Sequence, residues 1–511
     1  MRQSERSWGR VQQLGLAAGP VLAVLVYLLL PHAYPSVDGA PVDFGHAGRA
    51  TAGVAVWMAA WWFTEAIPIY ATALLPLVLL PLLRAASMKA AAAPYAHELI
   101  FLFMGGFLLA LAMERWGLHR RVALAALRVA GDRPVNVIGA FMAVSAGLSM
   151  WVSNTATAIM MLPVALSVVE LVAQRAAPGD PADSLGSPGS PIRSFAVALL
   201  LGIAYAASIG GIATPIGTPP NLFLLSYVHS HLGREISFVR WMALALPLVV
   251  VFLPIVWLLL TRVLHPVKLS RIEGGSALVG RALRDLGPMS RGERIVLGVF
   301  LLTSGLWITR PLLSGIEVAG IRPLAGLTDA GIAMLAALLL FVAPVDRRAG
   351  TFALDWDTAV KLPWGILILF GGGLSLAAAI QQNGVAELIG SQVSVFADVP
   401  SWIVVLAVVA AIILLTELTS NTATTAALVP VLASVAPGLG FDPLLLVVPA
   451  AISASCAFML PVATPPNAVI FGSGVVRIPD MVRAGFWLNA IGIALITLFT
   501  YAVAMPVLGV R

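Results

Sequence analysis

Apolar segments of about 20 residues recur along almost the whole chain, and they decide what it can fold into. Clear examples are Leu14–Leu30, Phe195–Ile209, Trp241–Leu260, Ala330–Val342 and Phe486–Val507. A helix of this length crosses the ~30 Å hydrocarbon core of a bilayer, where only helices and closed barrels satisfy every backbone polar group. Charged residues are only 11% of the chain and the mean hydropathy is +0.96, as expected for a membrane protein. We therefore predict an all-α polytopic membrane protein with roughly ten to twelve spans.

The basic residues predict which ends of the spans face the cytoplasm. Residues 262–294 contain seven Lys or Arg against three acidic residues, one of them Glu273, and Arg2, Arg6 and Arg10 precede the first span. Short basic segments beside membrane spans stay cytoplasmic, so we expect a cytoplasmic N-terminus, uncleaved because no small-residue cleavage pattern follows the first apolar run. The net charge of +6 is then explained by basic residues at the cytoplasmic ends of the spans, so no nucleic-acid partner is expected. We expect the protein in the inner (cytoplasmic) membrane.

A polar pentapeptide occurs twice within this apolar chain. Ser153–Thr157 (Ser-Asn-Thr-Ala-Thr) recurs 267 residues later as Ser420–Thr424, and the same offset places Ser149 on Thr416. A second motif, Thr218-Pro-Pro-Asn221, recurs as Thr464-Pro-Pro-Asn467 at an offset of 246. The Pro/Gly/Ser-rich stretch Pro178–Pro191 accounts for most of the difference and is interpreted as a surface-loop insertion. The chain is therefore an internal duplication.

The duplication predicts an inverted repeat. One leading helix and a five-span repeat would place both the N-terminus and the segment after Arg262 on the same side, and a repeat with an odd number of spans inserts its second copy upside down. The predicted division is an N-terminal segment with the first helix (1–50), a first repeat (51–262), a cytoplasmic inter-repeat loop (263–294) and a second repeat (295–511).

The repeated motifs have the composition of helix breaks. Ser, Asn and Thr start helices, and Pro-Pro ends an incoming helix but begins a new one. Either motif alone could be only a helix cap or polar contact between helices; two matched pairs favour a binding site. Free N–H groups at broken helices suit an anion, while unpaired carbonyls and hydroxyls suit Na⁺.

Few ionisable residues interrupt the apolar segments. Glu65 is one, and Glu114 with His119 ends a predicted hairpin at Gly105–Leu118, interpreted as a solvated interfacial edge. Glu417 precedes Ser420 by three residues; it could couple protons or attract cations, but support of a loop through backbone hydrogen bonds is the favoured interpretation. No nucleophile elbow, phosphate-binding loop or zinc-protease spacing occurs, so an enzyme is not expected.

With these motifs the chain resembles the divalent anion:sodium symporter family (the solute carrier 13 type). The resemblance runs from Trp61–Pro68 to the end of the chain and includes Gly210–Asn221, Trp364–Gly373 and Pro461–Asn467. It implies an inverted-repeat transporter with about 11 transmembrane helices, two re-entrant hairpins, and a scaffold plus a transport domain that moves as an elevator. It also implies a homodimer in the lipid bilayer.

The resemblance further implies the residues of the site. One Na⁺ would be bound by Ser149, Ser153, Asn154 and the backbone of Gly217, and a second by Thr416, Thr419, Asn421 and the backbone of Ala463. The substrate carboxylates would meet Asn154, Thr155, Thr218, Asn421, Thr422, Thr464 and Pro465. The coupling ions would be two or more Na⁺. Their positive charge would let a pocket without arginine bind a dianion.

The expected function is Na⁺-coupled symport of a dicarboxylate such as succinate, malate or fumarate. A Na⁺-independent dicarboxylate exchanger, and a citrate or sulfate symporter of the same family, remain as alternatives. Proton coupling through Glu417 and an anion channel are weaker alternatives.

Overall fold

The computed structural model describes residues 9–35, 41–175, 190–269, 271–272, 274–317 and 320–510. Most of the predicted insertion at Pro178–Pro191, as well as Arg2, Arg6 and Glu273, lies outside these residues. Within the described residues, eight helices are long and apolar enough to cross a membrane, and six shorter apolar helices accompany them. The prediction of a polytopic helical membrane protein is confirmed, while the number of about 11 spans stays a prediction.

The first half of the chain contains twelve α-helices and two short strands among the described residues. They are α1 (Arg10–Leu29), β1 (Ala33–Pro35), β2 (Pro41–Asp43), α2 (His46–Thr64), α3 (Ile69–Thr72), α4 (Leu75–Leu82), α5 (Met88–Ala92), α6 (Glu98–Arg115), α7 (Leu118–Leu127), α8 (Pro134–Ser149), α9 (Asn154–Arg175), α10 (Pro191–Gly211), α11 (Pro219–Leu232) and α12 (Phe238–Leu258).

The second half repeats this order from α17 onward. Its elements are α13 (Gly275–Asp285), α14 (Arg291–Leu313), α15 (Asp329–Val342), β3 (Pro344–Asp346), β4 (Thr351–Phe352), α16 (Trp356–Ala359), α17 (Trp364–Gln382), α18 (Val385–Val393), α19 (Ser401–Thr416), α20 (Asn421–Gly438), α21 (Leu444–Ala454), α22 (Pro465–Phe471), α23 (Ile478–Phe499) and α24 (Met505–Leu508). The strands form two antiparallel pairs, β1–β2 and β3–β4.

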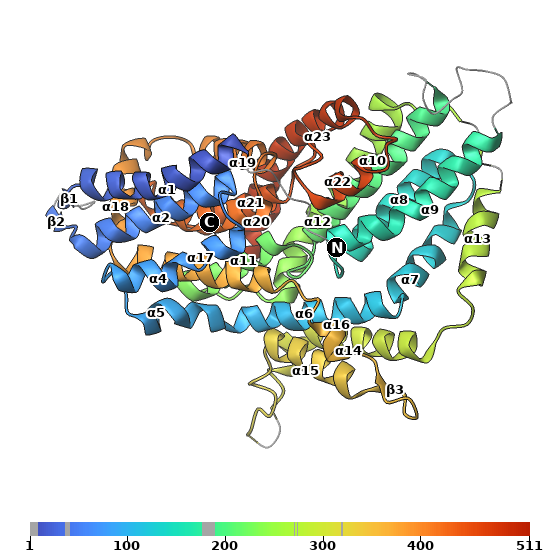
Figure 1. Cartoon of the computed structure of the whole chain (residues 1–511), viewed down its shortest axis with the longest axis horizontal. Helices are drawn as coiled ribbons and strands as arrows, with labels where there is room; N and C mark the ends of the chain where they lie inside the picture. Colours follow the sequence, from blue (N-terminus) through green and yellow to red (C-terminus); the bar gives the residue numbers. More distant parts are fainter. Residues whose placement is uncertain are drawn as a thin grey trace.

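Two helical hairpins approach the centre of the molecule from opposite sides. Figure 1 shows α8 and α9 to the right of the centre and α19 and α20 to its left. The two offsets relate α8–α9 to α19–α20 and α10–α11 to α21–α22, so each half contributes one hairpin and one broken helix. This is the arrangement expected of an inverted repeat.

Small residues let the central helices pack closely. A Cβ added to Gly105 on α6 would lie 2.5 Å from the backbone of Ala333 on α15, and one added to Gly210 would lie 2.7 Å from the carbonyl carbon of Ala146 on α8.

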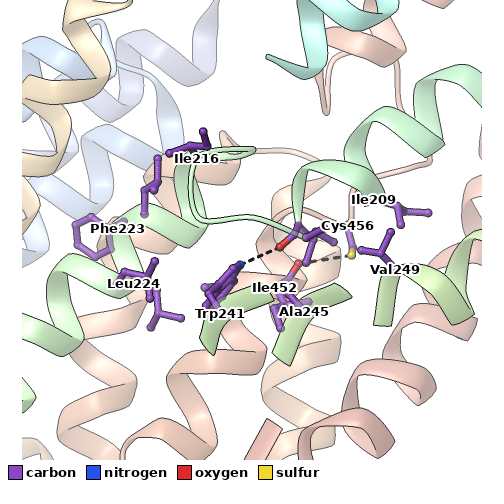
Figure 2. Packing of buried hydrophobic residues seen from close by; sticks show 14 of the residues in the cluster. Ile209, Ile216, Phe223, Leu224, Trp241, Ala245, Val249, Ile452 and Cys456 are labelled. Atoms are coloured by element: carbon purple, nitrogen blue, oxygen red, sulfur yellow. Dashed lines mark hydrogen bonds between the residues drawn. The ribbon is translucent and has the colours of Figure 1, made fainter. Parts of the chain in front are cut away.

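Figure 2 shows the core beneath the α10–α11 loop, where the buried Trp241 of α12 donates from Nε1 to the Ile212 carbonyl at 3.0 Å. The loop is thus anchored to a rigid apolar core.

Three local predictions need correction. Gly105–Leu118 is not a hairpin, because α6 continues as one helix to Arg115 before a turn at Gly117 leads into α7. The predicted boundaries at 50/51 and 294/295 fall inside α2 and α14, whose first residues are His46 and Arg291. The segment 263–294 is not all loop, since α13 lies within it. The division into repeats itself remains a prediction.

Candidate functional site

Each Ser-Asn-Thr motif lies at the tip of a hairpin. Ser153 precedes the first residue of α9 and Ser420 precedes the first residue of α20, and each hydroxyl accepts a hydrogen bond from the backbone N–H three residues on, at 3.2 and 3.5 Å. A side-chain acceptor of this kind satisfies one of the unpaired N–H groups at a helix start. The cap interpretation is therefore confirmed. The capped tips also face a cavity, and the binding-site interpretation stays a prediction.

Each Thr-Pro-Pro-Asn motif restarts a broken helix. Thr218 and Thr464 have extended backbones, and the prolines that follow begin α11 and α22. The asparagines that end the motifs hold the preceding loops: Asn221 Nδ2 donates to the carbonyls of Gly211, Ile212 and Thr214 at 2.8–3.2 Å. Asn467 Nδ2 donates in the same way to Ala457 and Leu460 at 3.3 and 3.1 Å. Both broken segments are thereby fixed.

The two tips and the two restarts line one cavity of about 1150 Å³. Eleven predicted site residues line it: Ser153, Asn154, Thr155, Gly217, Thr218, Thr419, Asn421, Thr422, Ala463, Thr464 and Pro465. Helices α9, α11 and α20 begin at this cavity, so the positive ends of three helix dipoles face it. Residues 267 positions apart are thus brought together as the duplication predicts.

Ser149 and Thr416 do not line the cavity but lie directly behind it, fully buried. The Ser149 hydroxyl donates to Asn154 Oδ1, and the Thr416 hydroxyl contacts Asn421 Oδ1 at 2.6 Å and the Ala454 carbonyl at 3.0 Å. Each hydroxyl therefore orients the carboxamide of its own hairpin tip.

Oxygen atoms converge where the first tip meets the first loop. A Cβ added to Gly211 would lie 2.7 Å from Asn154 Oδ1 and 3.1 Å from the Gly217 carbonyl oxygen. A side chain at Gly211 would fill this space, and two of the three nearest atoms are neutral oxygens of the kind that suit Na⁺, the third being Asn154 Nδ2 at 3.2 Å. The neighbouring Gly210 serves a different purpose, since it packs closely against Ala146 of α8.

Each tip is tied to its neighbouring loop, but by different chemistry in the two halves. In the first half, the Thr214 hydroxyl of the loop contacts the Met150 carbonyl of the tip and accepts from Gly217 N at 3.1 Å. In the second half, the Glu417 carboxylate of the tip accepts from Leu460 N of the loop at 3.2 Å. Met150 and Glu417 correspond at the 267 offset, and Thr214 and Leu460 at the 246 offset. The same two positions therefore meet in both halves. In the first half the loop residue uses its side chain and the tip residue its backbone, and in the second half the tip residue uses its side chain and the loop residue its backbone.

Glu417 is buried, with an exposed fraction of 4%, and its hydrogen bonds explain how it is tolerated. Its carboxylate also accepts from Phe458 N at 2.7 Å, from Met459 N at 3.0 Å and from Asn489 Nδ2 at 2.8 Å. The expectation that this residue supports a loop through the backbone is confirmed.

Several cavity residues were not predicted as part of the site. Glu65, which ends α2 in the left-handed conformation, lines the cavity together with Tyr70 and Glu114. Lys361 is the one Lys or Arg of the described residues that lines it. No pattern in the sequence brings these positions to the motifs, because they come from segments far apart in the chain. Thr214 and Asn489 likewise belong to no motif that would have marked them in the sequence. Asn221 and Asn467, by contrast, are the last residues of the repeated Thr-Pro-Pro-Asn motifs.

Metal chemistry based on charged ligands finds no support in the described part of the chain. It contains no group of three or more His, Cys, Asp or Glu side chains placed to hold an ion.

Comparison with known proteins gives a match over nearly the whole chain. The family model described as the sodium:sulfate symporter transmembrane region matches residues 18–510. A Staphylococcus saprophyticus protein described as sodium-dependent dicarboxylate transporter SdcS is 41% identical over 510 residues, covering 100% of this chain and 94% of that protein. The protein of the same description from Staphylococcus aureus (strain bovine RF122 / ET3-1) is 41% identical over 501 residues, covering 98% and 92%.

A solved structure is similar in fold. The crystal structure of the Alcanivorax borkumensis YdaH transporter superposes with a TM-score of 0.60 over 98% of this chain and 99% of that chain, at 13% identity. At this identity the likeness concerns the fold alone.

Proposed function

The chain belongs to the sodium:sulfate symporter family, and on that premise we propose that it is a Na⁺-coupled symporter of four-carbon dicarboxylates. The observation that carries the proposal is the single cavity of about 1150 Å³ lined by both hairpin tips and both broken helices. The SdcS relatives, described as sodium-dependent dicarboxylate transporters, support the choice of ion and substrate.

Two Na⁺ ions bind at the junctions between tip and loop. The first is held by Ser149, Ser153 and Asn154 with the Gly217 carbonyl, where the oxygens around Gly211 converge. The second is held by Thr416, Thr419 and Asn421 with the Ala463 carbonyl, and the buried carboxylate of Glu417 pins the adjoining loop. Ion binding orders each tip against its loop and leaves the cavity electropositive.

The dicarboxylate then binds between the two tips. Its carboxylates meet the side chains of Asn154, Thr155 and Thr218 from the first half and those of Asn421, Thr422 and Thr464 from the second, with Pro465 at the edge. Because the cavity is nearly free of basic side chains, the bound Na⁺ ions and the helix N-termini supply the positive field. Ions therefore bind before substrate.

Transport follows from the movement of a hairpin-bearing domain against a scaffold. Hairpin α8–α9 packs on α10 and α22, while α6 is locked to α15 through Gly105, which supports two separate bodies. The cavity includes Gly9 and Gln12 at the start of α1, so this conformation opens toward the side of the N-terminus, proposed to be cytoplasmic. The homodimer and the inner-membrane location are further parts of the proposal.

The proposal is tested by uptake of radiolabelled succinate into proteoliposomes that contain the full chain. An inward Na⁺ gradient is compared with a matched K⁺ gradient, with and without dicarboxylate inside. Concentrative uptake that requires Na⁺ is expected.

Two other outcomes have defined meanings. Uptake that ignores Na⁺ but requires internal dicarboxylate would identify an exchanger and overturn the assignment of the cation ligands. Na⁺-dependent uptake of citrate or sulfate in place of succinate would keep the cation sites and change the substrate.

A further inference from the structure

The α11–α12 junction, residues 229–238, is fastened to helices of the other proposed body. Helix α11 packs on α20 and α21 of the hairpin-bearing body, whereas α6 is locked to α15 of the scaffold. At the end of α11, His229 Nε2 lies 3.3 Å from Glu98 Oε1 of α6. Ser230 Oγ lies 2.9 Å from the Nε2 atom of His97, which directly precedes α6. Side chains thus join the end of α11 to the start of a scaffold helix.

The hydrogen bond between His97 and Ser230 has a defined direction. His97 Nδ1 accepts from the backbone N–H of Leu99 at 3.3 Å, so the neutral ring carries its proton on Nε2. Ser230 Oγ donates to the Ser226 carbonyl at 2.7 Å, which leaves its lone pairs free to accept from His97 Nε2. Each donor is matched by an acceptor, so the contact between the two helices is specific.

The other end of the junction is held by Asp329, the first residue of α15. Its Oδ2 atom accepts from the backbone N–H of Phe238, the first residue of α12, at 3.0 Å. The first N–H groups of a helix have no partner within it, and a carboxylate there is favoured by the helix dipole. The Phe238 ring stacks on Trp307 of α14 with centroids 4.4 Å apart, and both side chains are buried. Two scaffold helices therefore seat the start of α12.

Arg310 of α14 links the junction to the same aspartate. Its Nη2 atom lies 2.7 Å from Glu235 Oε1 of the junction, and its Nε atom lies 2.7 Å from Asp329 Oδ1. The Arg310 and Asp329 side chains are 14% and 11% exposed, whereas that of Glu235 is 61% exposed. Exposed ion pairs contribute little stability and buried ones are costly to break. Glu235 is thus the partner that can leave for water, while the pair between α14 and α15 stays.

The junction lies at the far ends of helices that line the motif cavity. Helix α6 reaches the cavity at Glu114 and the junction at Glu98, and α11 begins at the cavity with Pro219 and ends at the junction. At ~1.5 Å per residue, the 14 residues of α11 separate the two by ~20 Å. Because the cavity opens toward the side of the N-terminus, the junction lies on the side that is closed in this conformation.

The seam beside the junction is incompletely packed. A cavity of about 320 Å³ lies there, with His97, Ser230, His231 and Gln381 in its wall. Well-packed interiors leave few voids larger than a water molecule, and polar contacts exchange readily for contacts with water. Helices α6 and α15, by contrast, meet backbone to backbone at Gly105. The seam at the end of α11 can therefore part at a lower cost than the packing within the scaffold.

We propose that the α11–α12 junction is a latch, which holds the protein open toward the side of the N-terminus and is released when the cavity opens on the opposite side. The latch rests on the proposed function, because movement of the hairpin-bearing body against the scaffold is what separates these contacts. The contacts stabilise this conformation alone, so their loss shifts the population toward the opposite-facing one.

The test asks from which side of the membrane the cavity can be reached, and it needs no substrate. Cys456, the one cysteine of the chain, is replaced by Ala, and Ile159, a 56% exposed residue of the cavity wall, by Cys. The full chain with a cleavable N-terminal tag is reconstituted into proteoliposomes, and a membrane-impermeant maleimide is added outside. Molecules whose tag resists an added protease have the N-terminus inside, so the reagent reaches them from the opposite side. Their labelling rate measures the population open to that side.

The variant that releases the latch combines Ser230→Ala, His229→Ala and Glu235→Ala. Each substitution removes one contact across the seam, about two- to threefold in the conformational equilibrium, so labelling from the opposite side should rise roughly 8- to 27-fold. Glu235→Ala alone changes an exposed side chain and should give about two- to threefold, even if the triple variant folds poorly. The matched control is Arg234→Gln, because Arg234 of the same junction pairs with Asp442, between α20 and α21 of its own body. It should leave the labelling unchanged.

Two results overturn the latch: unchanged labelling from the opposite side in both latch variants, or an equal rise in Arg234→Gln. A Tm close to that of the unaltered protein shows that each variant is folded. Succinate uptake that fails or ignores Na⁺ would overturn the proposed substrate or ion, while the labelling still decides the latch. Equal labelling of the unaltered reporter protein from both sides would indicate a continuous pore, and both the symporter and the latch would then be wrong.

Discussion

Replacing Glu417 by Gln tests how the second half of the site is held. The carboxylate accepts hydrogen bonds from the backbone N–H groups of residues 458–460 and from Asn489, at 2.7–3.2 Å. A glutamine keeps one acceptor oxygen but turns an NH₂ group toward the N–H of either Phe458 or Leu460. One charged hydrogen bond is then lost and a buried donor is left without a partner.

The cost of this change follows from the bonds it removes. A hydrogen bond to a charged group contributes ~1.5–3 kcal/mol and an unpaired buried donor costs ~1–3 kcal/mol, so we expect a loss of about 2.5–6 kcal/mol in the free energy of unfolding. If about 1.4 kcal/mol of this opposes ordering of the loop that carries Ala463, the apparent Na⁺ affinity falls about tenfold.

The assay is the Na⁺ dependence of succinate uptake in proteoliposomes, with thermal unfolding of the same preparation. Glu170→Gln, an exposed position on α9 that bonds only to Gln174 in the described structure, is the matched control. An unchanged Na⁺ half-saturation and Tm in Glu417→Gln would refute the argument that the carboxylate fixes the loop. Loss of the pH dependence of uptake in this variant would instead favour proton coupling.

Three further predictions concern other parts of the molecule. Thr214→Val removes the contacts to Met150 and Gly217, so we expect a loss of ~1–3 kcal/mol in stability and a higher Na⁺ half-saturation. The control is Thr309→Val, a half-buried threonine whose hydroxyl bonds only within α14 in the described structure, and equal effects of the two substitutions would contradict the prediction. Burial lowers the pKa of His265 in the folded protein, and the nearby Asp480 opposes this only in part. As the pH falls below ~6.5, the usual pKa of histidine, the unfolded chain therefore binds a proton more readily than the folded chain. The folded state is then less stable than it is above that pH. The Tm should therefore fall between pH 7.5 and 5.5, and a His265→Gln variant with the same slope would disprove this cause. Lys361→Gln should raise the KM for dicarboxylate a few-fold, most at low ionic strength because the charge is exposed; an unchanged KM would show that this cation does not act on the substrate.

The sequence predicted the helix breaks that line the cavity better than it predicted the helices around them. The repeated motifs identified both tips and both restarts, because helix-breaking residues in apolar segments have few structural explanations. It failed at Gly105–Leu118, which was predicted as a hairpin, whereas α6 continues to Arg115 and Gly105 lets this helix pack against Ala333 of α15. Close helix packing and helix breaks both use glycine, and only tertiary contacts distinguish them.

Residues that reach the cavity from distant helices could not be predicted. Glu65, Glu114 and Lys361 lie in unrelated sequence contexts, and their proximity depends on how the end of α2, helix α6 and the turn between α16 and α17 come together. The Glu417 hydrogen bonds were anticipated because a carboxylate three residues from a break needs backbone donors in an apolar segment. The asparagine at 489 that completes the set lies on α23, 72 residues away, with no motif to mark it.

The exchanged contact between tip and loop shows what the two halves have inherited from their common ancestor. Aligned residue by residue, Met150 and Glu417 are a mismatch, and so are Thr214 and Leu460. What has persisted is the adjacency of the two positions, while the atoms that bond there have changed. A search for the duplication by residue identity would therefore overlook a contact that holds the tip to the loop in both copies.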